Sequence, residues 1–514
     1  MFSTVLSGAL IGVSAYLVSA EVDIAQGLPC FSMVGSLGGE VKESRERVSV
    51  ALKNAGFELP PKRITVNLSP ADKRKDGTAF DLAIAIGILE ALGYFEADAS
   101  KDILFLGELG LDGEVKKVRG VLPIVREAAK RGIRQCIVPA VNAGEGAVIP
   151  GIRVRGAAHI SEVFAFLRER EESMRELILP AQGGGRGEES SEEREKQLDF
   201  ADVYGQEGAK RAAEIAAAGF HNLLMVGPPG AGKSMIAKRI PGIMPPLTLE
   251  ESLEVTTVAS VAGILEEGSG LVTKRPFCSP HHTISQPALV GGSINPRPGV
   301  ISLAHRGVLF LDELPEFQRA SLDAMRQPLE ERKVYVSRMG ASVVFPSEFM
   351  LVCAMNPCPC GYYPDRNRCK CTESQIKRYM GKVSGPILDR IDLCVELQPV
   401  AISGLHMGSG EESSEAIRKR VLRARERQAE RFQGSHCRFN ADIDVTNIGE
   451  FCVLGAEEKA FAEKLYDSLQ LSARAYHRII KVARTIADLE GAERIGTEHL
   501  MEASFYRPSL EYWI

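Results

Sequence analysis

The 514-residue sequence lacks the features that mark membrane and secreted proteins. It contains no run of 18 or more strongly apolar residues, so we expect no membrane-spanning helix. The uncharged stretch of residues 5–20 is not preceded by the Lys or Arg that a secretory signal peptide requires. We therefore interpret residues 16–24 as a strand of a folded domain.

The sequence also lacks an excess of basic residues and any internal repeat. Its 62 Lys and Arg residues are outnumbered by 67 Asp and Glu residues, which gives a net charge of −5 at pH 7. This balance excludes a globally basic nucleic-acid-binding protein but is compatible with a local basic channel. The 25% of charged and 45% of hydrophobic residues are typical of a soluble globular protein, and the length predicts two to four domains.

A glycine-rich segment that follows an apolar run predicts a phosphate-binding loop. The run is Leu223-Leu-Met-Val226, and a helix-compatible stretch begins at Met235. A strand, a glycine-rich loop and a helix N-terminus together surround phosphate oxygens with backbone N–H groups. Lys233 can reach the β- and γ-phosphates, and Ser234 can ligate Mg²⁺. The residues expected to bind ATP are Gly227, Pro228, Pro229, Gly230, Ala231, Gly232, Lys233 and Ser234.

Polar residues end two further apolar runs. Val308-Leu-Phe-Leu311 is typical of a strand buried on both faces, and Asp312 and Glu313 follow it. Open α/β sheets bind ligands at the C-terminal ends of their strands, so we expect Asp312 to hold Mg²⁺ and Glu313 to polarise the attacking water. The run 350–355 ends in Asn356, which either orients that water or contacts the γ-phosphate; the alternative is that it caps the turn before Pro357.

Composition divides the chain into four parts. Residues 182–187 are rich in glycine and the next nine are highly charged, which is typical of a flexible linker. Before it, runs such as 63–67 and 103–106 predict strands, and 80–92 and 121–131 predict helices. The predicted boundaries are 1–180 for an α/β domain, 181–198 for the linker, 199–400 for the nucleotide-binding domain and 401–514 for a helical region.

Three more motifs follow one another in a specific order. They are Asp202-Val-Tyr-Gly205-Gln206, Pro386-Ile-Leu-Asp-Arg390-Ile-Asp392 and Ser472-Ala-Arg474-Ala-Tyr-His-Arg478. With the phosphate loop, they make the chain similar to AAA+ ATPases of the magnesium-chelatase and MCM-helicase clade, and more narrowly to the bacterial ComM/YifB family of magnesium-chelatase-like ATPases. The resemblance covers nearly the whole chain. It implies a Lon-protease-like N-terminal domain (ribosomal S5 domain 2-like), a P-loop AAA+ parallel-sheet domain and a helical C-terminal lid of the magnesium-chelatase type.

The resemblance also implies a ring, expected to be a hexamer, that binds ATP and Mg²⁺ at the interfaces between subunits. Arg390 would then act as an arginine finger on the neighbour's γ-phosphate, and the alternative is a surface ion pair with Asp389. Arg474 matches the sensor-2 position of the lid, although a solvated helix face is the alternative and Arg478 is a rival one turn later. Val300 and Ser293 depart from the family pattern, which puts details of the interface or pore in doubt.

The segment Lys75-Asp-Gly-Thr-Ala-Phe-Asp81 resembles the nucleophile segment of Lon-type proteases. A Ser–Lys dyad needs a hydroxyl and an amine within hydrogen-bond reach. By this resemblance the nucleophile position is Ala79 and the lysine position falls near Leu122, and neither side chain can perform the chemistry. Thr78 and Lys75 would serve only after a shift in register. We therefore predict a domain without peptidase activity.

Four of the eleven cysteines form a tight cluster, which predicts a Zn²⁺ site. The arms are of the C-x-C type, which is tighter than the commoner C-x-x-C, and free thiols or a disulfide pair are the alternatives. The candidate ligands are Cys358, Cys360, Cys369 and Cys371. The other seven cysteines are scattered and are interpreted as packing residues, and a nucleotide site with unpaired cysteines indicates a reducing cytoplasm.

Two elements are expected to line the ring pore, as they do in the helicases that the chain resembles. One is the insertion 268–300, with Lys274, Arg275, Phe277, His281, His282 and Arg297; the other is a β-hairpin over 334–345 that turns at Gly340. The alternative is that both elements only complete the core. The arginine-rich stretch 418–431 also contains Glu415, Glu426 and Glu430, so we interpret it as a solvated helix with i,i+4 pairs.

The main functional hypothesis is an ATP-driven ring motor on DNA, which by resemblance would catalyse branch migration in the homologous recombination of natural transformation. Lys233, Ser234, Asp312, Glu313, Asn356, Arg390 and Arg474 would carry ATP turnover. The alternatives are a metal-insertion subunit like the magnesium-chelatase motor, or a protein-remodelling ATPase. Stimulation of ATPase activity by DNA, by porphyrin or by polypeptide distinguishes the three.

Overall fold

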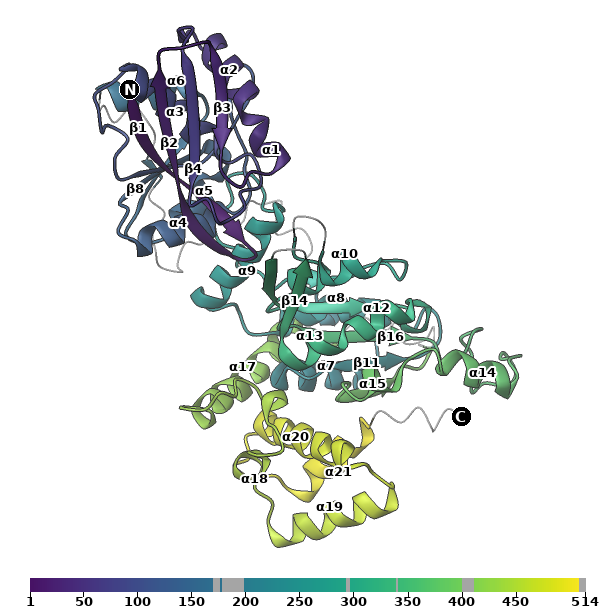
Figure 1. The fold of residues 1–514 in the computed structure, drawn as a ribbon. Helices are drawn as coiled ribbons and strands as arrows, with labels where there is room; N and C mark the ends of the chain where they lie inside the picture. Colours follow the sequence, from purple (N-terminus) through teal and green to yellow (C-terminus); the bar gives the residue numbers. More distant parts are fainter. Residues whose placement is uncertain (170–175, 178–197, 293–295, 339–340, 400–410, 508–514) are drawn as a thin grey trace.

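The structure is a computed structural model, and it describes residues 1–169, 176–177, 198–292, 296–338, 341–399 and 411–507. Nearly all of the expected linker 181–198 lies outside the described residues, as do Ser293, the hairpin turn at Met339 and Gly340, and residues 400–410. Three units follow one another along the molecule in Figure 1: an N-terminal α/β unit, a nucleotide-binding unit in the middle, and a helical C-terminal unit at the bottom. No helix of the described residues is both long enough and apolar enough to cross a membrane.

The N-terminal unit is built on a mixed eight-stranded sheet in the order β10-β9-β8-β5-β1-β2-β4-β3. β1 and β2 pair antiparallel from Phe2↔Asp23 to Ile11↔Ser14, so the stretch interpreted as a strand forms half of a long hairpin. The strands are β1 (Phe2–Ile11), β2 (Ser14–Ala25), β3 (Cys30–Val34), β4 (Arg63–Ser69), β5 (Ile103–Phe105), β8 (Gln135–Pro139), β9 (Arg153–Ala157) and β10 (Glu176–Leu177).

Helices pack on this sheet through apolar faces. α3 is almost wholly buried because ten of its twelve residues are in the core, and it packs on β1 and β2. A small hairpin, β6 (Glu108–Leu109) with β7 (Val115–Lys116), precedes α4. The helices are α1 (Gly39–Lys42), α2 (Ser44–Asn54), α3 (Asp81–Leu92), α4 (Val121–Lys130), α5 (Ala143–Ala147) and α6 (Ile160–Glu169).

The nucleotide-binding unit contains a five-stranded parallel sheet in the order β12-β13-β16-β11-β17. Its three central strands are buried on both faces, as their continuous apolar runs predict. Alternate residues of β11 contribute to two different core clusters, with Leu223 and Met225 on one side and Leu224 and Val226 on the other. The strands are β11 (Leu223–Val226), β12 (Phe277–Cys278), β13 (Val308–Leu311), β16 (Met350–Met355) and β17 (Leu393–Glu396).

Helices and a separate hairpin surround this sheet. The predicted hairpin is present as β14 (Lys333–Arg338) paired with β15 (Ala341–Pro346), with Tyr335 opposite Val344. The helices are α7 (Glu207–Gly219), α8 (Lys233–Ile243), α9 (Leu249–Ala262), α10 (Gln286–Val290), α11 (Val300–Leu303), α12 (Arg319–Ala324), α13 (Arg326–Glu331), α14 (Glu373–Met380) and α15 (Gly385–Leu388).

The C-terminal unit is helical and shares one core cluster with the face of the sheet that α7 covers. Its helices are α17 (Ser414–Arg431), α18 (Ile448–Phe451), α19 (Ala456–Ser468), α20 (Ala473–Glu490) and α21 (Thr497–Phe505). α17 contains the expected Glu415–Lys419 pair at 2.8 Å. However, Arg420 contacts Glu214 of α7 and Arg431 contacts Asp488 of α20, so these arginines join the helix to its neighbours rather than only covering a solvated face.

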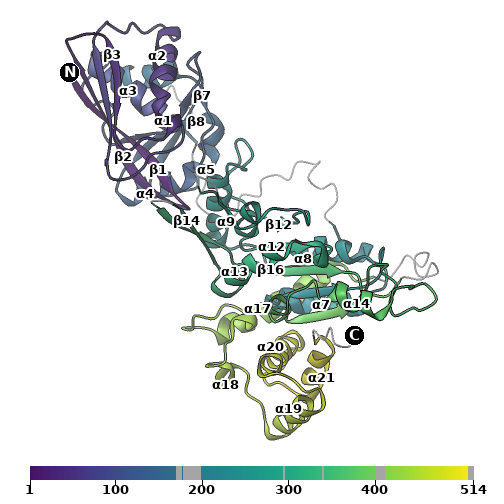
Figure 2. The same ribbon diagram turned by 45° about the vertical axis from the view of Figure 1, so that its right-hand side comes forward.

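The hairpin β14–β15 reaches the N-terminal unit at the turn between β1 and β2 (Figure 2). Gly12 lies so close to β15 that a Cβ there would be 2.3 Å from Cγ1 of Val343. A second contact joins α4 to α9, because Gly120 N donates to Ser260 O at 3.0 Å and Lys117 Nζ donates to Leu265 O at 2.6 Å. The hairpin β14–β15, which we expected at a pore, therefore packs against the N-terminal unit on one side.

Candidate nucleotide-hydrolysis site

The predicted phosphate-binding loop lies at the C-terminal end of β11 and runs into α8, whose first residue is Lys233. Gly230 and Gly232 have φ values of +79° and +91°, a left-handed conformation that glycine adopts without strain. A Cβ at Gly227 would lie 2.7 Å from the carbonyl oxygen of Leu397, so this position has no room for a side chain. The loop can therefore curl tightly and direct backbone N–H groups to a bound phosphate.

Lys233 bends back over this loop. Its Nζ donates to Gly227 O at 2.6 Å, to Pro228 O at 2.9 Å and to Asn356 Oδ1 at 3.1 Å. Burial lowers the pKa of Lys233, and the charge of Asp312 opposes that shift. The ammonium group is thus held beside Asn356, at the adjoining ends of β11 and β16. From there it can exchange its present hydrogen bonds for bonds to phosphate oxygens.

Ser234 and Asp312 are brought together as the sequence predicts. Ser234 Oγ donates to Asp312 Oδ2 at 2.7 Å across 78 residues of sequence. Asp312 Oδ1 accepts from the backbone N of Glu313 at 2.9 Å, which fixes the carboxylate. A hydroxyl and a carboxylate are hard oxygen ligands of the kind that Mg²⁺ takes in nucleotide sites, so these two residues fit that ion.

Glu313 has a contact that sequence reasoning missed. Its Oε2 lies 3.2 Å from Nδ1 of His282, a residue that we assigned either to the pore or to packing. His282 also packs against His281, with ring centroids 4.1 Å apart. Glu313 itself has φ +53°, in the left-handed region that few non-glycine residues occupy. Only the fold brings these residues together, because they are far apart in sequence and no local pattern relates them.

Arg390 lies at the other end of the same sheet. Its backbone O accepts from Nδ2 of Asn222 at 2.7 Å, and Asn222 directly precedes β11. The phosphate loop directly follows β11, so the length of the strand separates Arg390 from the chain's own phosphate-binding loop. The guanidinium donates to Pro386 O at 2.7 Å and pairs with Glu330 of α13, and not with Asp389 as the alternative held.

Burial and two neighbouring cations disfavour the charge of Arg390, and the carboxylate of Glu330 opposes them. Burial lowers its pKa, and the positive charges of Arg326 and Arg474 lower it further. Nε of Arg390 is buried without a hydrogen-bond partner among the described residues. The guanidinium already has an anionic partner in Glu330, so a phosphate would have to replace that carboxylate.

Arg474 and Arg478 both project from the first turns of α20 toward Asp389. Arg474 Nη1 lies 3.5 Å from Asp389 Oδ2, and its side chain is 73% exposed. Arg478 is mostly buried and donates to Ile391 O at 2.6 Å and to Leu388 O at 3.3 Å. Of the two rivals for the sensor role, only Arg474 is thus free to contact a ligand, and Arg478 supports the loop that carries Arg390.

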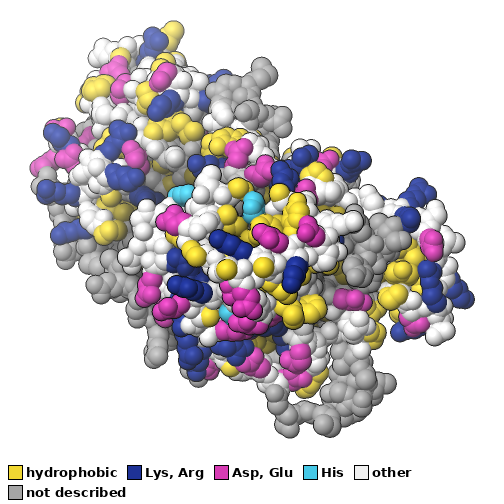
Figure 3. Space-filling model, turned by 90° about the horizontal axis from the view of Figure 1, so that it is seen from below, with side chains coloured by type: hydrophobic (Ala, Val, Ile, Leu, Met, Phe, Trp, Pro, Cys, Tyr) yellow, Lys and Arg dark blue, Asp and Glu magenta, His cyan; other side chains and the backbone are white. Residues whose placement is uncertain are grey.

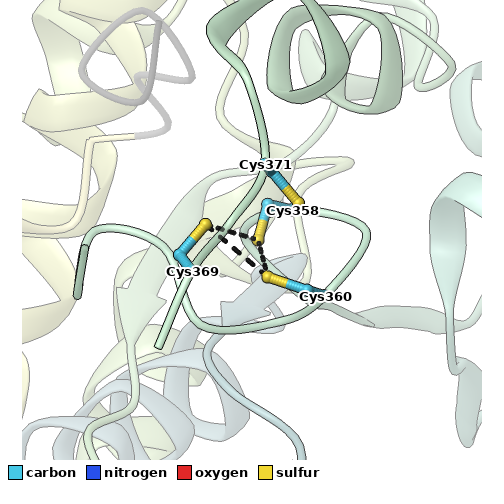
Figure 4. Close-up of side chains that lie close together, drawn as sticks. All are labelled: Cys358, Cys360, Cys369 and Cys371. Atoms are coloured by element: carbon cyan, nitrogen blue, oxygen red, sulfur yellow. Dashed lines mark hydrogen bonds between the residues drawn. The ribbon is translucent and has the colours of Figure 1, made fainter. Parts of the chain in front are cut away.

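The four predicted metal ligands lie in one loop (Figure 4). The Sγ atom of Cys358 is 3.3 Å from that of Cys360 and 3.7 Å from that of Cys369, and all four sulfurs lie within 4.8 Å of one another. A tetrahedral zinc with Zn–S bonds near 2.3 Å requires sulfurs about 3.8 Å apart, so the donor set fits zinc. Burial opposes ionisation, but hydrogen bonds from Tyr362 N and from the neighbouring thiols lower the pKa of Cys360 to about 6.

This cysteine loop packs directly on the phosphate-binding loop. A Cβ at Gly361 would lie 2.4 Å from Cδ of Pro229, and Gly361 has φ +84°. Beside this contact is a cavity of about 370 Å³, and its lining includes Gly227, Pro228, Tyr362, Arg368 and Gln398. The cysteine loop therefore forms one wall of the nucleotide-binding region.

The Lon-like segment does not contain an assembled dyad. Lys75 is fully buried, burial lowers its pKa, and its Nζ donates to Pro70 O. Thr78 Oγ1 instead donates to Glu108. Leu122 is fully buried in α4, and Ala79 is part-buried beside its core cluster.

The residues expected to line a pore differ in whether their side chains are exposed or packed. Arg275 is buried, where it donates to Pro245 O and Arg306 O and pairs with Glu251 at 3.2 Å, and Phe277 stacks on Phe310. The side chains of both residues make packing contacts, which favours the alternative that they complete the core. Lys274 and Arg297 are exposed, as is Tyr335 of the hairpin at 45%.

Comparison with known proteins places this geometry in a family. The model described as "Magnesium chelatase, subunit ChlI" matches residues 199–405, "Subunit ChlI of Mg-chelatase" matches 20–142, and "Magnesium chelatase, subunit ChlI C-terminal" matches 411–507.

Individual relatives match over almost the whole length. The competence protein ComM of Haemophilus influenzae is 44% identical over 98% of this chain and 97% of its own, and YifB of Escherichia coli is 43% identical over 98% and 97%. The magnesium-chelatase 67 kDa subunit of Chlorobaculum parvum is 26% identical over 44% of this chain and 32% of its own. With its P-loop, its paired Ser234 and Asp312 and its parallel sheet, the chain is an AAA+ ATPase that belongs to the ComM/YifB family of magnesium-chelatase-like proteins.

Proposed function

We propose that this protein is a cytoplasmic ring-forming motor, a hexamer, that uses ATP hydrolysis to move on DNA and drives branch migration in the homologous recombination of natural transformation. This proposal depends on a nucleotide site shared between two subunits, and one observation supports such a site. The residues that suit phosphate and Mg²⁺ gather at the C-terminal end of β11, whereas Arg390 and Arg474 lie by its N-terminal end. A single copy cannot bring both sets to one γ-phosphate, and a second copy packed against the first can.

The chemistry divides between the two copies. Lys233 and the loop amides would bind the β- and γ-phosphates, Asn356 and Glu313 would orient the attacking water, and Ser234 with Asp312 would hold Mg²⁺. When bound, that ion offsets the negative charge of the phosphates. Arg390 of the next subunit would exchange Glu330 for the γ-phosphate, with Arg474 beside it. Arginines supplied in this way increase turnover by about 10³–10⁵ in other nucleotide hydrolases.

DNA as the partner is supported by two features. The Haemophilus influenzae relative is named a competence protein, and it covers nearly the whole chain. In addition, Lys274 and Arg297 of the insertion and Tyr335 of the hairpin remain exposed, a combination of cations and an aromatic ring that suits a phosphate backbone and stacked bases.

We also propose that the cluster Cys358, Cys360, Cys369 and Cys371 binds one structural zinc. Its role would be to hold Gly361 against Pro229 and so to support the phosphate-binding loop. Metal analysis of the purified protein should give one zinc per chain, and none in a variant with Cys369→Ser and Cys371→Ser. A wild-type preparation without stoichiometric metal would remove this part of the proposal.

The N-terminal unit is proposed to act in assembly and not as a peptidase. Lys75 donates to Pro70 O and Thr78 donates to Glu108, so the amine that a Ser–Lys type of dyad needs does not contact the hydroxyl. Casein cleavage by the wild type that disappears in Thr78→Ala would contradict this assignment.

A metal-insertion motor is the second candidate, because the Chlorobaculum parvum magnesium-chelatase subunit matches 44% of the chain. That match leaves more than half of the chain without a counterpart, whereas the relatives named ComM and YifB match 98%. Stimulation of ATPase activity by porphyrin would favour this candidate, and stimulation by unfolded polypeptide would favour a protein-remodelling ATPase.

The deciding experiment measures ATPase rates of the full chain with single-stranded, duplex and four-way-junction DNA. We expect DNA to increase turnover, the increase to weaken with salt because phosphate contacts release counterions, and Lys233→Met to be inactive under every condition. Equal turnover with and without each DNA would exclude a DNA motor.

Mixing two inactive variants tests the shared site. In a ring, a subunit with Arg390→Ala keeps an intact phosphate loop, and a Lys233→Met neighbour keeps an intact arginine. An equal mixture should restore about a quarter of the interfaces, because head-to-tail contacts pair each subunit's loop with the next subunit's arginine. No recovery in mixtures that have exchanged subunits would contradict a site shared in this way.

A further inference from the structure

The segment 358–382, called here the cysteine knuckle, is strongly basic in an acidic protein. It contains six Lys or Arg residues and two acidic residues, although the chain as a whole carries a net charge of −5. The space-filling view of Figure 3 shows dark blue side chains at the right-hand end of the molecule, where α14 lies. The basic residues are Arg366, Arg368, Lys370, Lys377, Arg378 and Lys382.

Five of these six cations have no ion-pair partner among the described residues. Lys370, Lys377 and Arg378 are exposed, and no ion pair joins them to any described residue. Lys382 is the exception in this set, because its Nζ lies 3.0 Å from Oε1 of Glu316. Concentrated unpaired charge of one sign destabilises a surface through self-repulsion unless an oppositely charged ligand neutralises it.

The knuckle also presents planar groups. Arg368 lies 4.0 Å above the ring of Tyr362, and Arg366 lies 5.0 Å from the ring centre of Tyr363. Arg366 Nη1 donates to Cys371 O at 3.0 Å, so the cysteine cluster fixes the guanidinium in place. Cations and flat side chains on a rigid loop match the alternating phosphates and bases of a single nucleic-acid strand.

The knuckle directly follows Asn356 and packs on the phosphate-binding loop through Gly361 and Pro229. A ligand bound to it would therefore lie close to the nucleotide, and away from the insertion and hairpin that we propose for the pore. We infer that the cysteine knuckle is a second nucleic-acid contact, in which Lys370, Lys377 and Arg378 bind the phosphate backbone of a single strand outside the pore. This inference rests on the proposed action on DNA and adds a surface to it.

The test uses the full chain with Lys370→Ala, Lys377→Ala and Arg378→Ala combined. A matched control replaces three exposed cations of the N-terminal unit that also lack ion pairs among the described residues, namely Lys42, Lys53 and Lys130. Binding of a fluorescent 30-nucleotide oligo(dT) is measured over a series of salt concentrations. The knuckle variant should bind about tenfold more weakly, and the slope of log K against log salt should fall by about 2, since each phosphate contact in a single strand contributes about 0.7.

Basal ATPase activity without DNA serves as the test of folding, and both variants should retain it, because none of the six residues belongs to the hydrolysis site. If the knuckle variant is poorly folded, Lys377→Ala with Arg378→Ala on the exposed face of α14 replaces it, with a slope reduced by about 1.4. An unchanged affinity and slope, with the wild type binding normally, would overturn the inference and leave the proposed motor intact. A wild type that binds no DNA would overturn both.

Discussion

The nucleotide-binding unit and the N-terminal unit each contain a lysine and a hydroxyl in a glycine-containing loop together with a carboxylate, but the contacts of these side chains differ. At the nucleotide site, Lys233 donates to Asn356 and Ser234 donates to Asp312, and these residues lie at adjoining strand ends. In the Lon-like segment, Lys75 donates to Pro70 O, Thr78 donates to Glu108, and Asp81 pairs with Arg47 at 2.7 Å. The same kinds of residue therefore serve the fold in the N-terminal unit, whereas in the nucleotide-binding unit we propose that they serve a substrate.

The difference follows from where each loop lies. A loop at the C-terminal end of parallel strands faces open space, because the strands end there and the helices begin. The Lon-like segment is covered instead by α2, whose Arg47 reaches Asp81, and by the β6 hairpin, which carries Glu108. Side chains that pair beneath other elements of the fold are not accessible to a ligand.

The largest difference between the two units should come from replacing their lysines, because one substitution should abolish ATP turnover and the other should lower stability. Lys233→Met removes the only side-chain ammonium that contacts the phosphate loop in the described contacts, so ATP turnover should fall to background while the melting temperature stays near that of the wild type. Lys75→Met should leave turnover unchanged and lower the free energy of unfolding by about 1–3 kcal/mol, because the carbonyl of Pro70 loses its donor. Steady-state ATPase assays and denaturant titrations measure the two effects, and reversed outcomes would break the comparison.

Arg390→Ala should reduce turnover by about 10³–10⁵ in assembled rings while ATP still binds, because the phosphate loop of each subunit is intact. The matched variant Arg478→Ala alters a buried arginine that supports the loop at 388–391, so it should lower stability as well as turnover. Turnover and nucleotide affinity are measured together. A fully active Arg390→Ala would show that this guanidinium does not act on the nucleotide.

His282→Ala should slow hydrolysis by about tenfold, because Glu313 loses the side chain that lies 3.2 Å from its carboxylate. His281→Ala is the control, since His281 packs on His282 but has no contact with Glu313 among the described residues. The readout is single-turnover hydrolysis at saturating ATP, where binding does not limit the rate. Equal effects of both substitutions would indicate packing and not orientation of Glu313.

The smallest expected effect concerns Glu254, whose charge stabilises the nucleotide-binding unit. Burial opposes the ionisation of Glu254, but hydrogen bonds from His305 and Arg306 lower its pKa to about 2, below its unfolded value near 4.5. Because the folded pKa is the lower one, this stabilisation is present above pH 4.5 and is lost as the pH falls toward 2. The melting temperature of Glu254→Gln should be lower than that of the wild type at pH 7, and the gap should narrow in that acid range. A gap that does not depend on pH would refute the assignment.

Much of the site was predictable because its signals are local. The phosphate loop, Asp312 and Asn356 each end an apolar run, and β11, β13 and β16 occupy those runs. The cysteine cluster could also be predicted from the sequence, since its four cysteines lie within fourteen residues. The hairpin β14–β15 followed from two runs rich in β-branched residues around a turn.

Other features could not be predicted, because they depend on which segments pack together. Nothing near Arg275 or Phe277 in the sequence reveals that Arg275 pairs with Glu251 of α9 or that Phe277 stacks on Phe310 of β13. The contact between His282 and Glu313 and the pairing of Arg390 with Glu330 join separate elements in the same way.

By itself, the sequence determined that this chain binds a nucleotide, because a strand, a glycine-rich loop and a helix N-terminus are contiguous and need no other part of the protein to form a phosphate cradle. The tertiary structure alone decided which lysine, hydroxyl and carboxylate remain accessible to a ligand, and at which end of the strands the arginines lie. The physical reason is that burial and hydrogen bonding between distant segments either satisfy a polar group or leave it facing solvent, and only the packed fold brings those segments together.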